Sequence, residues 1–126
     1  MKRYLLDTHL LYWWMVADAR LGKTVRHIIA KSEIIVSAAS VWEMVLKNAK
    51  GKLPLPKGAI TEQLEAQGFI LLPIFPRHIE AARNLTCEHP DPFDRLLIAQ
   101  ALDERLTLLT RDAAILGLGL DAVAKG

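Results

Sequence analysis

The sequence predicts an α/β fold in which helices cover both faces of a parallel sheet of four to five strands. Short apolar runs, such as residues 4–6 and 34–36, do not alternate with polar residues, as expected of strands buried on both faces. Segments with helical spacing separate these runs, so strands and helices alternate along the chain. The 126 residues are 52% hydrophobic, which is enough for one core, and we expect a single domain over residues 1–126.

Helix caps and helix breakers mark the elements of the first half. Asp7 and Thr8 suit a helix start, and Ser37 and Ser40 offer caps for a later helix. The glycine and prolines of residues 51–56 cannot continue that helix. The expected elements are strands at 4–6 and 34–36, a turn at 18–21, and helices at 9–17, 24–31 and from 37 to about 50.

The second half follows the same alternation. Gly68 ends a helix before a strand, and Asp91-Pro92 is a helix-start signature with proline at the first helical position. Cys87 is the one cysteine, so no internal disulfide can form. The expected elements are helices at 59–67, 76–85, 92–104 and 113–116, strands at 69–72 and 106–109, and an edge strand at 122–124.

Bulk properties exclude several classes of protein. The net charge of +2 argues against a general polyanion coat. No apolar stretch approaches the roughly 18 residues of a membrane span, and the start of the chain carries no secretion signal. A reducing cytoplasm is the expected location, and no membrane association is expected.

Four acidic residues stand at informative places: Asp7, Glu43, Asp94 and Asp112. Asp7 and Asp112 follow expected strands, where parallel α/β sheets form their ligand crevice. Acids gathered there would repel one another unless a hard cation, which prefers oxygen ligands, held them. The four acids therefore predict a metal site, although Asp7 and Asp112 equally suit helix caps.

Helical spacing decides between neighbouring acids. Asp91 is expected to be the cap or a group that supports the metal ligands. Asp94 instead heads an apolar stripe through Leu97 and Ile98 and would be costly to bury without a partner. Glu43 either forms a surface pair with Lys47 or lies on a narrow polar face at a crevice edge. We favour the crevice, because the other faces of this helix carry Trp42, Val45, Leu46 and Ala49.

Other side chains give weaker signals. The lysines at 47, 50, 52 and 57 fit a phosphate-contact patch and a solvated helix end equally well. The tryptophans at 13, 14 and 42 could stack on bases, but core packing is favoured for at least two of them. The four histidines show no zinc-ligand spacing, and the chain has no glycine-rich phosphate loop.

The ordered motifs resemble the PIN-domain family, and more closely the VapC toxins of bacterial type II toxin–antitoxin pairs. The resemblance spans nearly the whole chain. A loop at residues 51–56 is also similar to one found in a branch of these toxins. The matching motifs are LLDT at 5–8, the segment 37–43, DPFDRLLIAQA at 91–101 and LTRD at 109–112.

The resemblance implies a three-layer α/β/α fold and a Mg²⁺- or Mn²⁺-dependent endoribonuclease. By motif, Asp7, Glu43, Asp94 and Asp112 match the family's acidic metal site, with Thr8 and Thr110 as supporting hydroxyls and Asp91 beside them. It also implies a toxin homodimer and a VapB-like antitoxin whose C-terminal segment fills the active-site groove, and with it a larger assembly on DNA.

These residues also suggest a mechanism for cutting RNA. Metal held by the carboxylates would activate water and relieve charge on the phosphate. Arg95, Arg111, Lys47, Lys50 and Lys52 are candidates for contacts to the RNA backbone. The alternatives are a PIN-type RNA-processing nuclease without an antitoxin and a catalytically silent binding module. The RNA target is not encoded in any short motif.

Overall fold

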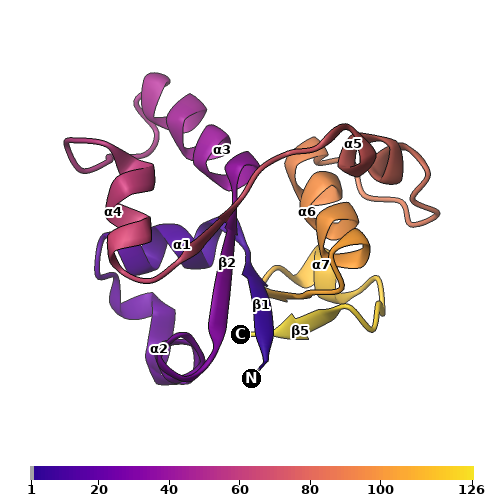
Figure 1. The fold of residues 1–126 in the computed structure, drawn as a ribbon, viewed down its shortest axis with the longest axis horizontal. Helices are drawn as coiled ribbons and strands as arrows, with labels where there is room; N and C mark the ends of the chain where they lie inside the picture. Colours follow the sequence, from indigo (N-terminus) through magenta and orange to yellow (C-terminus); the bar gives the residue numbers. More distant parts are fainter. Residues whose placement is uncertain (1) are drawn as a thin grey trace.

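Five parallel strands form one sheet at the centre of the computed structural model, which describes residues 2–126. Met1, the first residue of the expected domain, lies outside the described residues. The strand order is β3-β2-β1-β4-β5, and every neighbouring pair is parallel (Figure 1). The strands are β1 Arg3–Leu6, β2 Glu33–Ser37, β3 Ile70–Leu72, β4 Thr107–Thr110 and β5 Val123–Lys125.

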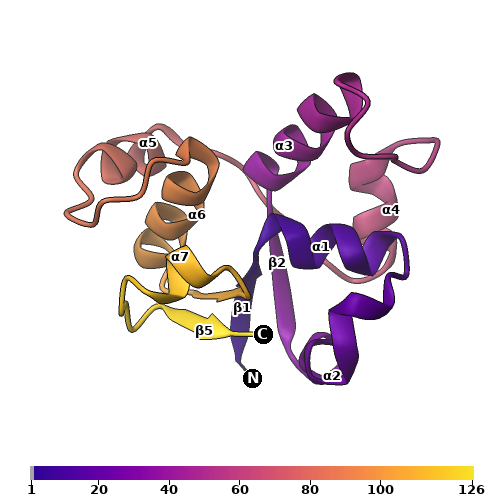
Figure 2. The same cartoon turned by 180° about the vertical axis from the view of Figure 1, so that it is seen from behind.

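Helices lie on both sides of this sheet, which confirms the predicted three-layer α/β/α class. Figures 1 and 2 show α1, α2 and α4 on one side and α5, α6 and α7 on the other, with α3 rising beyond the end of β2. The helices are α1 Thr8–Met15, η1 Ala19–Leu21, α2 Gly22–Lys31, α3 Ala38–Ala49, α4 Ile60–Ala66, α5 Pro76–Arg83, α6 Pro92–Asp103 and α7 Ala113–Leu116. No helix in the described part of the chain is both long and apolar enough to cross a membrane.

The register of β1 creates the crevice. Leu5 pairs with Ile35 of β2 on one side and with Leu108 of β4 on the other. The chain therefore winds outward in opposite directions from β1, which is the kind of switch point at which open parallel sheets bind ligands. Asp7 follows β1 and Thr110 ends β4, so both lie at this edge.

Successive residues of β1 pack into two different hydrophobic cores. Leu5 packs with Leu97 and Ile98 of α6, whereas Leu6 packs with Leu10 of α1. All these side chains are 0–1% exposed. A continuous apolar run is thus required here, because both faces of the strand are covered.

Two sequence expectations about burial were wrong. Trp42 is 55% exposed and Val45 is 37% exposed, because α3 packs instead through Ala39 and Met44. The outer face of α3 is therefore apolar but uncovered in this chain. The two tryptophans at 13 and 14 do pack against the core.

Helix α1 ends two residues earlier than expected. Ala17 has a φ of 54°, in the left-handed region that stops an α-helix. Its amide still donates to the carbonyl of Trp14, and Asp18 then caps the short helix η1. The other helix and strand ends lie within a few residues of the expected positions.

Candidate metal centre

Asp7 is both a helix cap and the buried acid of the crevice. Its Oδ1 accepts the Thr8 amide at 2.8 Å, and its Oδ2 accepts the Thr110 hydroxyl at 2.7 Å. The side chain is only 3% exposed, and this burial raises the pKa of Asp7. The two roles proposed for Asp7 are compatible, since one oxygen serves the cap and the other faces β4.

Thr110 connects Asp7 to Asp112. The same hydroxyl that donates to Asp7 accepts the Asp112 amide at 3.0 Å. Asp112 caps α7 by accepting the amides of Ala114 and Ile115 through Oδ1. The negative charge of Asp112 raises the pKa of Asp7 further, because the two carboxylates repel each other. Both border a cavity of about 250 Å³ that is also lined by His9, Leu10, Trp13 and Arg111.

The structure separates Asp91 from Asp94 as the spacing predicts. Asp91 caps α6, accepting the amides of Phe93 at 2.8 Å and Asp94 at 3.1 Å. Burial, together with repulsion from Asp7 and Asp91, raises the pKa of Asp94 to about 6. His89 Nε2 lies 2.9 Å from Asp94 Oδ2, a contact that sequence spacing did not indicate.

Glu43 carries a buried oxygen with nothing to bind it. The residue is 6% exposed on α3, and its Oε2 pairs with Lys47 Nζ at 2.8 Å. Its Oε1 has no hydrogen-bond partner within residues 2–126. One turn earlier, Ser40 accepts the Thr8 hydroxyl at 2.9 Å, which ties this face of α3 to the start of α1. The structure therefore confirms the pair with Lys47, while the place of Glu43 at a crevice edge stays a prediction.

The donor set fits a hard divalent cation. All four acids offer oxygen ligands, which Mg²⁺ and Mn²⁺ prefer. A buried carboxylate oxygen without a donor is costly in a protein, and a cation would satisfy it. Within residues 2–126, however, no three of these carboxylates bring ligand oxygens within 4.8 Å of one another. Asp7 and Asp112 line one cavity and Asp94 senses the charge of Asp7, but the four acids do not form a tight cage.

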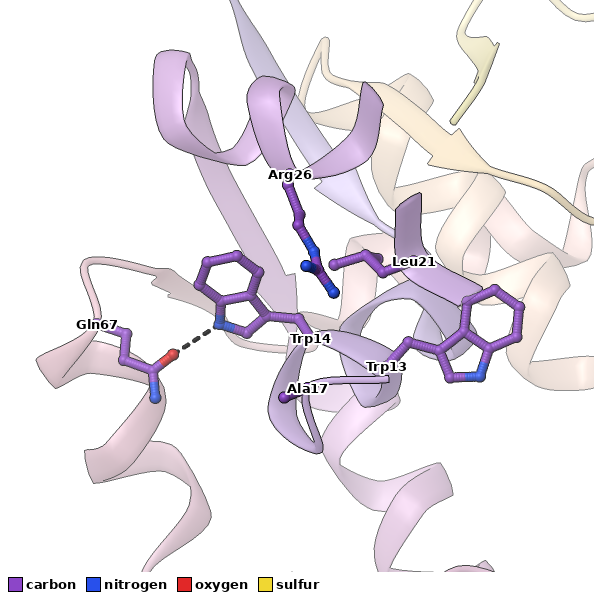
Figure 3. A pocket seen from close by; sticks show the side chains of 6 residues that line it. All are labelled: Trp13, Trp14, Ala17, Leu21, Arg26 and Gln67. Carbon is purple, nitrogen blue, oxygen red and sulfur yellow. Dashed lines mark hydrogen bonds between the residues drawn. The ribbon is translucent and has the colours of Figure 1, made fainter. Parts of the chain in front are cut away.

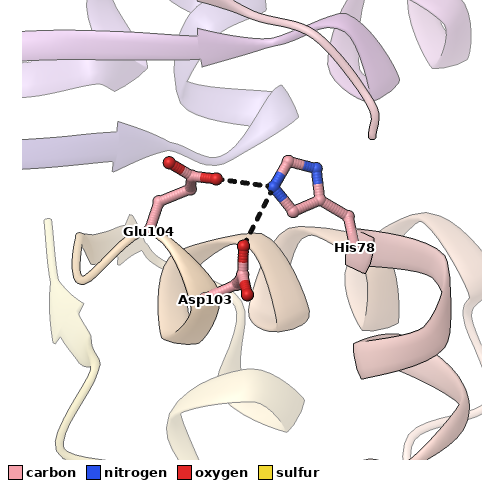
Figure 4. A group of neighbouring side chains, drawn as sticks. All are labelled: His78, Asp103 and Glu104. Atoms are coloured by element: carbon pink, nitrogen blue, oxygen red, sulfur yellow. Dashed lines mark hydrogen bonds and ion pairs between the residues drawn. The ribbon is translucent and has the colours of Figure 1, made fainter. Parts of the chain in front are cut away.

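The described residues that do meet that distance are His78, Asp103 and Glu104 (Figure 4). His78 Nδ1 accepts the Phe75 amide at 3.0 Å, so the ring hydrogen sits on Nε2, 2.7 Å from Glu104 Oε2. Arg77 pairs with both acids. The Arg77 guanidinium and the hydrogen on His78 Nε2 already bind the carboxylate oxygens to which a cation would have to bind. We interpret this group as a clamp between α5 and the end of α6.

A buried amide extends this clamp toward the sheet. Gln100 is fully buried, and its Oε1 accepts the Ser37 hydroxyl at 2.5 Å. Its Nε2 donates to the Pro73 carbonyl at 3.3 Å and lies 3.2 Å from His78 Nδ1. Ser37 also caps α3 through the Ala39 amide. Neither Gln100 nor His78 is marked by a local sequence pattern, because their partners lie far away along the chain.

Two of the candidate RNA-contact arginines bind the protein's own backbone. Arg95 donates to the carbonyls of Cys87 at 2.9 Å and Ala82 at 2.8 Å. Arg111 donates to three carbonyls of two separated segments and lies over the Trp13 ring, 5.4 Å from its centroid. Lys50 and Lys52, by contrast, are exposed in and beside the loop after α3. The lysines are therefore the better placed for solvent-side contacts.

A larger cavity has no acidic residue in its lining. It measures about 370 Å³ and is lined by the two adjacent tryptophans of α1 and by Gln67 and Arg26 (Figure 3). Trp14 Nε1 donates to Gln67 Oε1 at 2.6 Å across it. The remaining lining residues are Ala17 and Leu21. No carboxylate lines this cavity, but Trp13 also lines the cavity that Asp7 and Asp112 border, so the two cavities share this side chain.

Comparison with known proteins identifies the family. The family model described as PIN domain matches residues 4–119. Over 116 residues the chain is 31% identical to Ribonuclease VapC22 of Mycobacterium tuberculosis (strain ATCC 25618 / H37Rv), covering 89% of this chain and 88% of that protein.

Solved structures share the fold at low sequence identity. VapBC2 from Rickettsia felis, bound to a DNA fragment from its promoter, superposes with a TM-score of 0.65 at 14% identity over 98% of this chain and 97% of that chain. A toxin–antitoxin complex from Klebsiella pneumoniae gives 0.65 at 20% identity over 96% and 95%. FitAcB from Neisseria gonorrhoeae gives 0.63 at 20% identity over 97% and 95%. The chain therefore belongs to the PIN-domain family, within its VapC-type branch.

Proposed function

We propose that this chain is a Mg²⁺- or Mn²⁺-dependent endoribonuclease that acts in the cytoplasm as the toxin of a VapBC-type pair. Membership of the PIN family and the 31% identity to a protein named a ribonuclease support the nuclease class. The acidic crevice at the switch point of the sheet supports a metal-assisted reaction.

The buried Oε1 of Glu43 carries the metal assignment. It lies in a protein that satisfies its other buried side-chain polar atoms, within residues 2–126. Asp94 is meanwhile repelled by Asp7 and Asp91. An unpaired buried oxygen and mutually repelling carboxylates both destabilise the folded protein. A bound cation would remove both penalties.

Each acid then has a role. Asp7 and Asp94 would hold the ion directly, while Glu43 and Asp112 would orient waters or hold a second ion. Such an ion lowers the pKa of a bound water and neutralises charge on the scissile phosphate. Thr110 keeps the Asp7 carboxylate in place by donating to Oδ2, and Thr8 fixes α1 against α3 through Ser40.

The lysines are placed to receive the RNA backbone. Lys47 Nζ lies 2.8 Å from Glu43 Oε2, so Lys47 would stand beside the metal site if Glu43 contributes to it. Lys50 and Lys52 add positive charge along the exposed end of α3. Arg111 and Arg95 would contribute charge near the crevice while their donors remain on backbone carbonyls.

Substitution of Asp7 tests the assignment. Asp7→Asn keeps a residue that can cap α1 but removes the charge. With purified protein, RNA and Mg²⁺, we expect cleavage to fall by at least about a hundredfold, since a direct metal ligand is lost. The matched control is Asp121→Asn, which neutralises an exposed acid. Undiminished cleavage by a folded Asp7→Asn protein would sink the assignment.

The toxin role requires partners. Structural neighbours are named as toxin–antitoxin complexes, and one of them is bound to promoter DNA. We propose that this chain forms a homodimer and binds a VapB-like antitoxin whose C-terminal segment occupies the crevice, in an assembly that reaches DNA. Co-expression with the product of a neighbouring small reading frame should suppress RNA cleavage and yield one complex on size-exclusion chromatography.

Two alternatives give different results. An RNA-processing nuclease would cleave RNA but have no adjacent reading frame whose product inhibits it. A silent binding module would keep its fold yet bind no Mn²⁺ in a calorimetric titration. Mapping cleavage sites in total RNA after induced expression would identify the target, which fold and motifs do not specify.

A further inference from the structure

His89 touches the acid that stands at the head of α6. Its Nε2 lies 2.9 Å from Asp94 Oδ2, and the two side chains are 9% and 15% exposed. An ionised carboxylate can only accept a hydrogen bond, so the ring hydrogen sits on Nε2. The contact is therefore a largely buried, charge-assisted hydrogen bond, the stronger class of such bonds.

The loop that carries His89 is fastened on both sides. Two residues before it, the Cys87 carbonyl accepts Arg95 Nη1 at 2.9 Å. Two residues after it, Asp91 caps α6 through the amides of Phe93 and Asp94. Arg95 and Asp94 are neighbours on α6, so this helix holds the loop through a guanidinium and through the carboxylate itself. The position of His89 relative to Asp94 is thus fixed by the backbone.

This contact addresses a specific difficulty of the site. Asp94 is repelled by the charges of Asp7 and Asp91, which disfavours its charged form. The histidine donor on Oδ2 restrains the carboxylate and leaves Oδ1 for a ligand. Carboxylates that bind metals are commonly held by such hydrogen bonds, and loss of the supporting partner typically weakens metal binding about 10- to 100-fold.

We propose that His89 is a positioning residue that orients the Asp94 carboxylate for the divalent ion, an inference that rests on the proposed function. It acts through Asp94 and not through RNA. The requirement is for one donor at the position of the histidine Nε2 atom, and neither the ring nor its charge is needed.

Two amide substitutions test whether His89 acts as a hydrogen-bond donor at the position of Nε2 or only packs against its neighbours. In His89→Gln the side-chain amide nitrogen falls near the position of histidine Nε2, whereas in His89→Asn it falls near Nδ1 and cannot reach Asp94. We expect the Asn variant to bind Mn²⁺ about 10- to 100-fold more weakly by isothermal titration calorimetry at one neutral pH, and the Gln variant to retain most of the affinity. His27→Asn, at an exposed histidine of α2, is the matched control.

Thermal melting by circular dichroism checks that each variant is folded. If the Asn variant is too unstable to titrate, the Gln variant alone still decides, since it must bind Mn²⁺ nearly as wild type does. Equal affinity of wild type and His89→Asn, or equal loss in both amide variants, overturns the role of His89.

Mn²⁺ binding by the Asp94→Asn variant distinguishes failure of this inference from failure of the proposed function. If wild type binds Mn²⁺ and Asp94→Asn does not bind it more weakly, Asp94 is not a ligand and both proposals fall. If Asp94→Asn weakens binding but His89→Asn does not, only the role of His89 fails. When both hold, adding His89→Asn to Asp94→Asn should cost no further affinity, because the two residues act as one unit.

Discussion

The Thr110 hydroxyl donates to Asp7 Oδ2 at 2.7 Å, joining the end of β4 to the end of β1 across 103 positions of sequence. The same oxygen accepts the amide of Asp112, so one buried hydroxyl sets the positions of two carboxylates. The parallel pairing of Leu6 with Leu109 brings these strand ends together. The site is thus built into the sheet register.

Thr110→Val should impair the site more than the fold. Valine has a similar shape but leaves Asp7 Oδ2 without a donor and the Asp112 amide without an acceptor, each worth about 1–3 kcal/mol when buried. We expect a lower melting temperature and weaker Mn²⁺ binding. Thr107→Val on the same strand is the control. If both variants titrate alike, Thr110 has no part in arranging the acids.

Asp94→Asn should stabilise the metal-free protein above pH 6. A folded-state pKa of about 6, raised from 3.8, means that Asp94 contributes stability fully present below pH 3.8 and lost as pH rises through about 6. The neutral amide avoids this loss, by about 1–2 kcal/mol for a partly buried group.

Urea denaturation in chelator, at pH values above and below this window, measures the effect of Asp94→Asn. The gain should vanish at the acidic end. Asp121→Asn provides the reference for removing an exposed charge. A loss of stability at neutral pH would contradict the inference that repulsion dominates at Asp94.

Gln100→Met should destabilise the fold by about 2–4 kcal/mol. The substitution leaves the buried Ser37 hydroxyl without its acceptor and removes the contacts of the Gln100 amide to Pro73 and His78. The midpoint of urea unfolding reports the change. Gln67→Met is the matched control, because this exposed amide serves only Trp14 among its side-chain bonds in the described residues. Similar midpoints for the two variants would refute a structural role for Gln100.

Arg95→Gln should loosen the loop between α5 and α6. The guanidinium spans the carbonyls of Cys87 and Ala82, and glutamine cannot reach both. We expect faster amide hydrogen exchange over residues 84–91, with little change in the sheet. The exposed Arg83, replaced in the same way, should leave exchange unaltered. Unchanged exchange in Arg95→Gln would instead favour a role for Arg95 in RNA contact alone.

The sequence was sufficient to predict the order and type of the elements. Apolar runs and helical spacing act locally, and proline, glycine and capping residues mark the ends, as at Asp91 and Asp112. The left-handed conformation of Ala17 shows where this approach fails, because no residue type at that position announces it.

The spatial relations of side chains were only partly predictable. The covered face of α3 was misjudged, since apolar residues such as Trp42 and Val45 were expected to be inside. Hydrogen bonds between distant residues, such as those of His78 and Gln100, depend on tertiary packing and leave no periodic trace. The positions of Asp7 and Asp112 after strands could be predicted, because the ends of apolar runs are recognisable in the sequence.

The uncovered indole of Trp42 makes the protein its own optical probe. A solvated tryptophan emits at longer wavelengths than a shielded one, and the other two tryptophans already pack on the core. In a variant with phenylalanine at positions 13 and 14, fluorescence would come from α3 alone. A blue shift of this emission on raising the protein concentration, or on adding a second chain, would show that another protein chain covers Trp42 on α3.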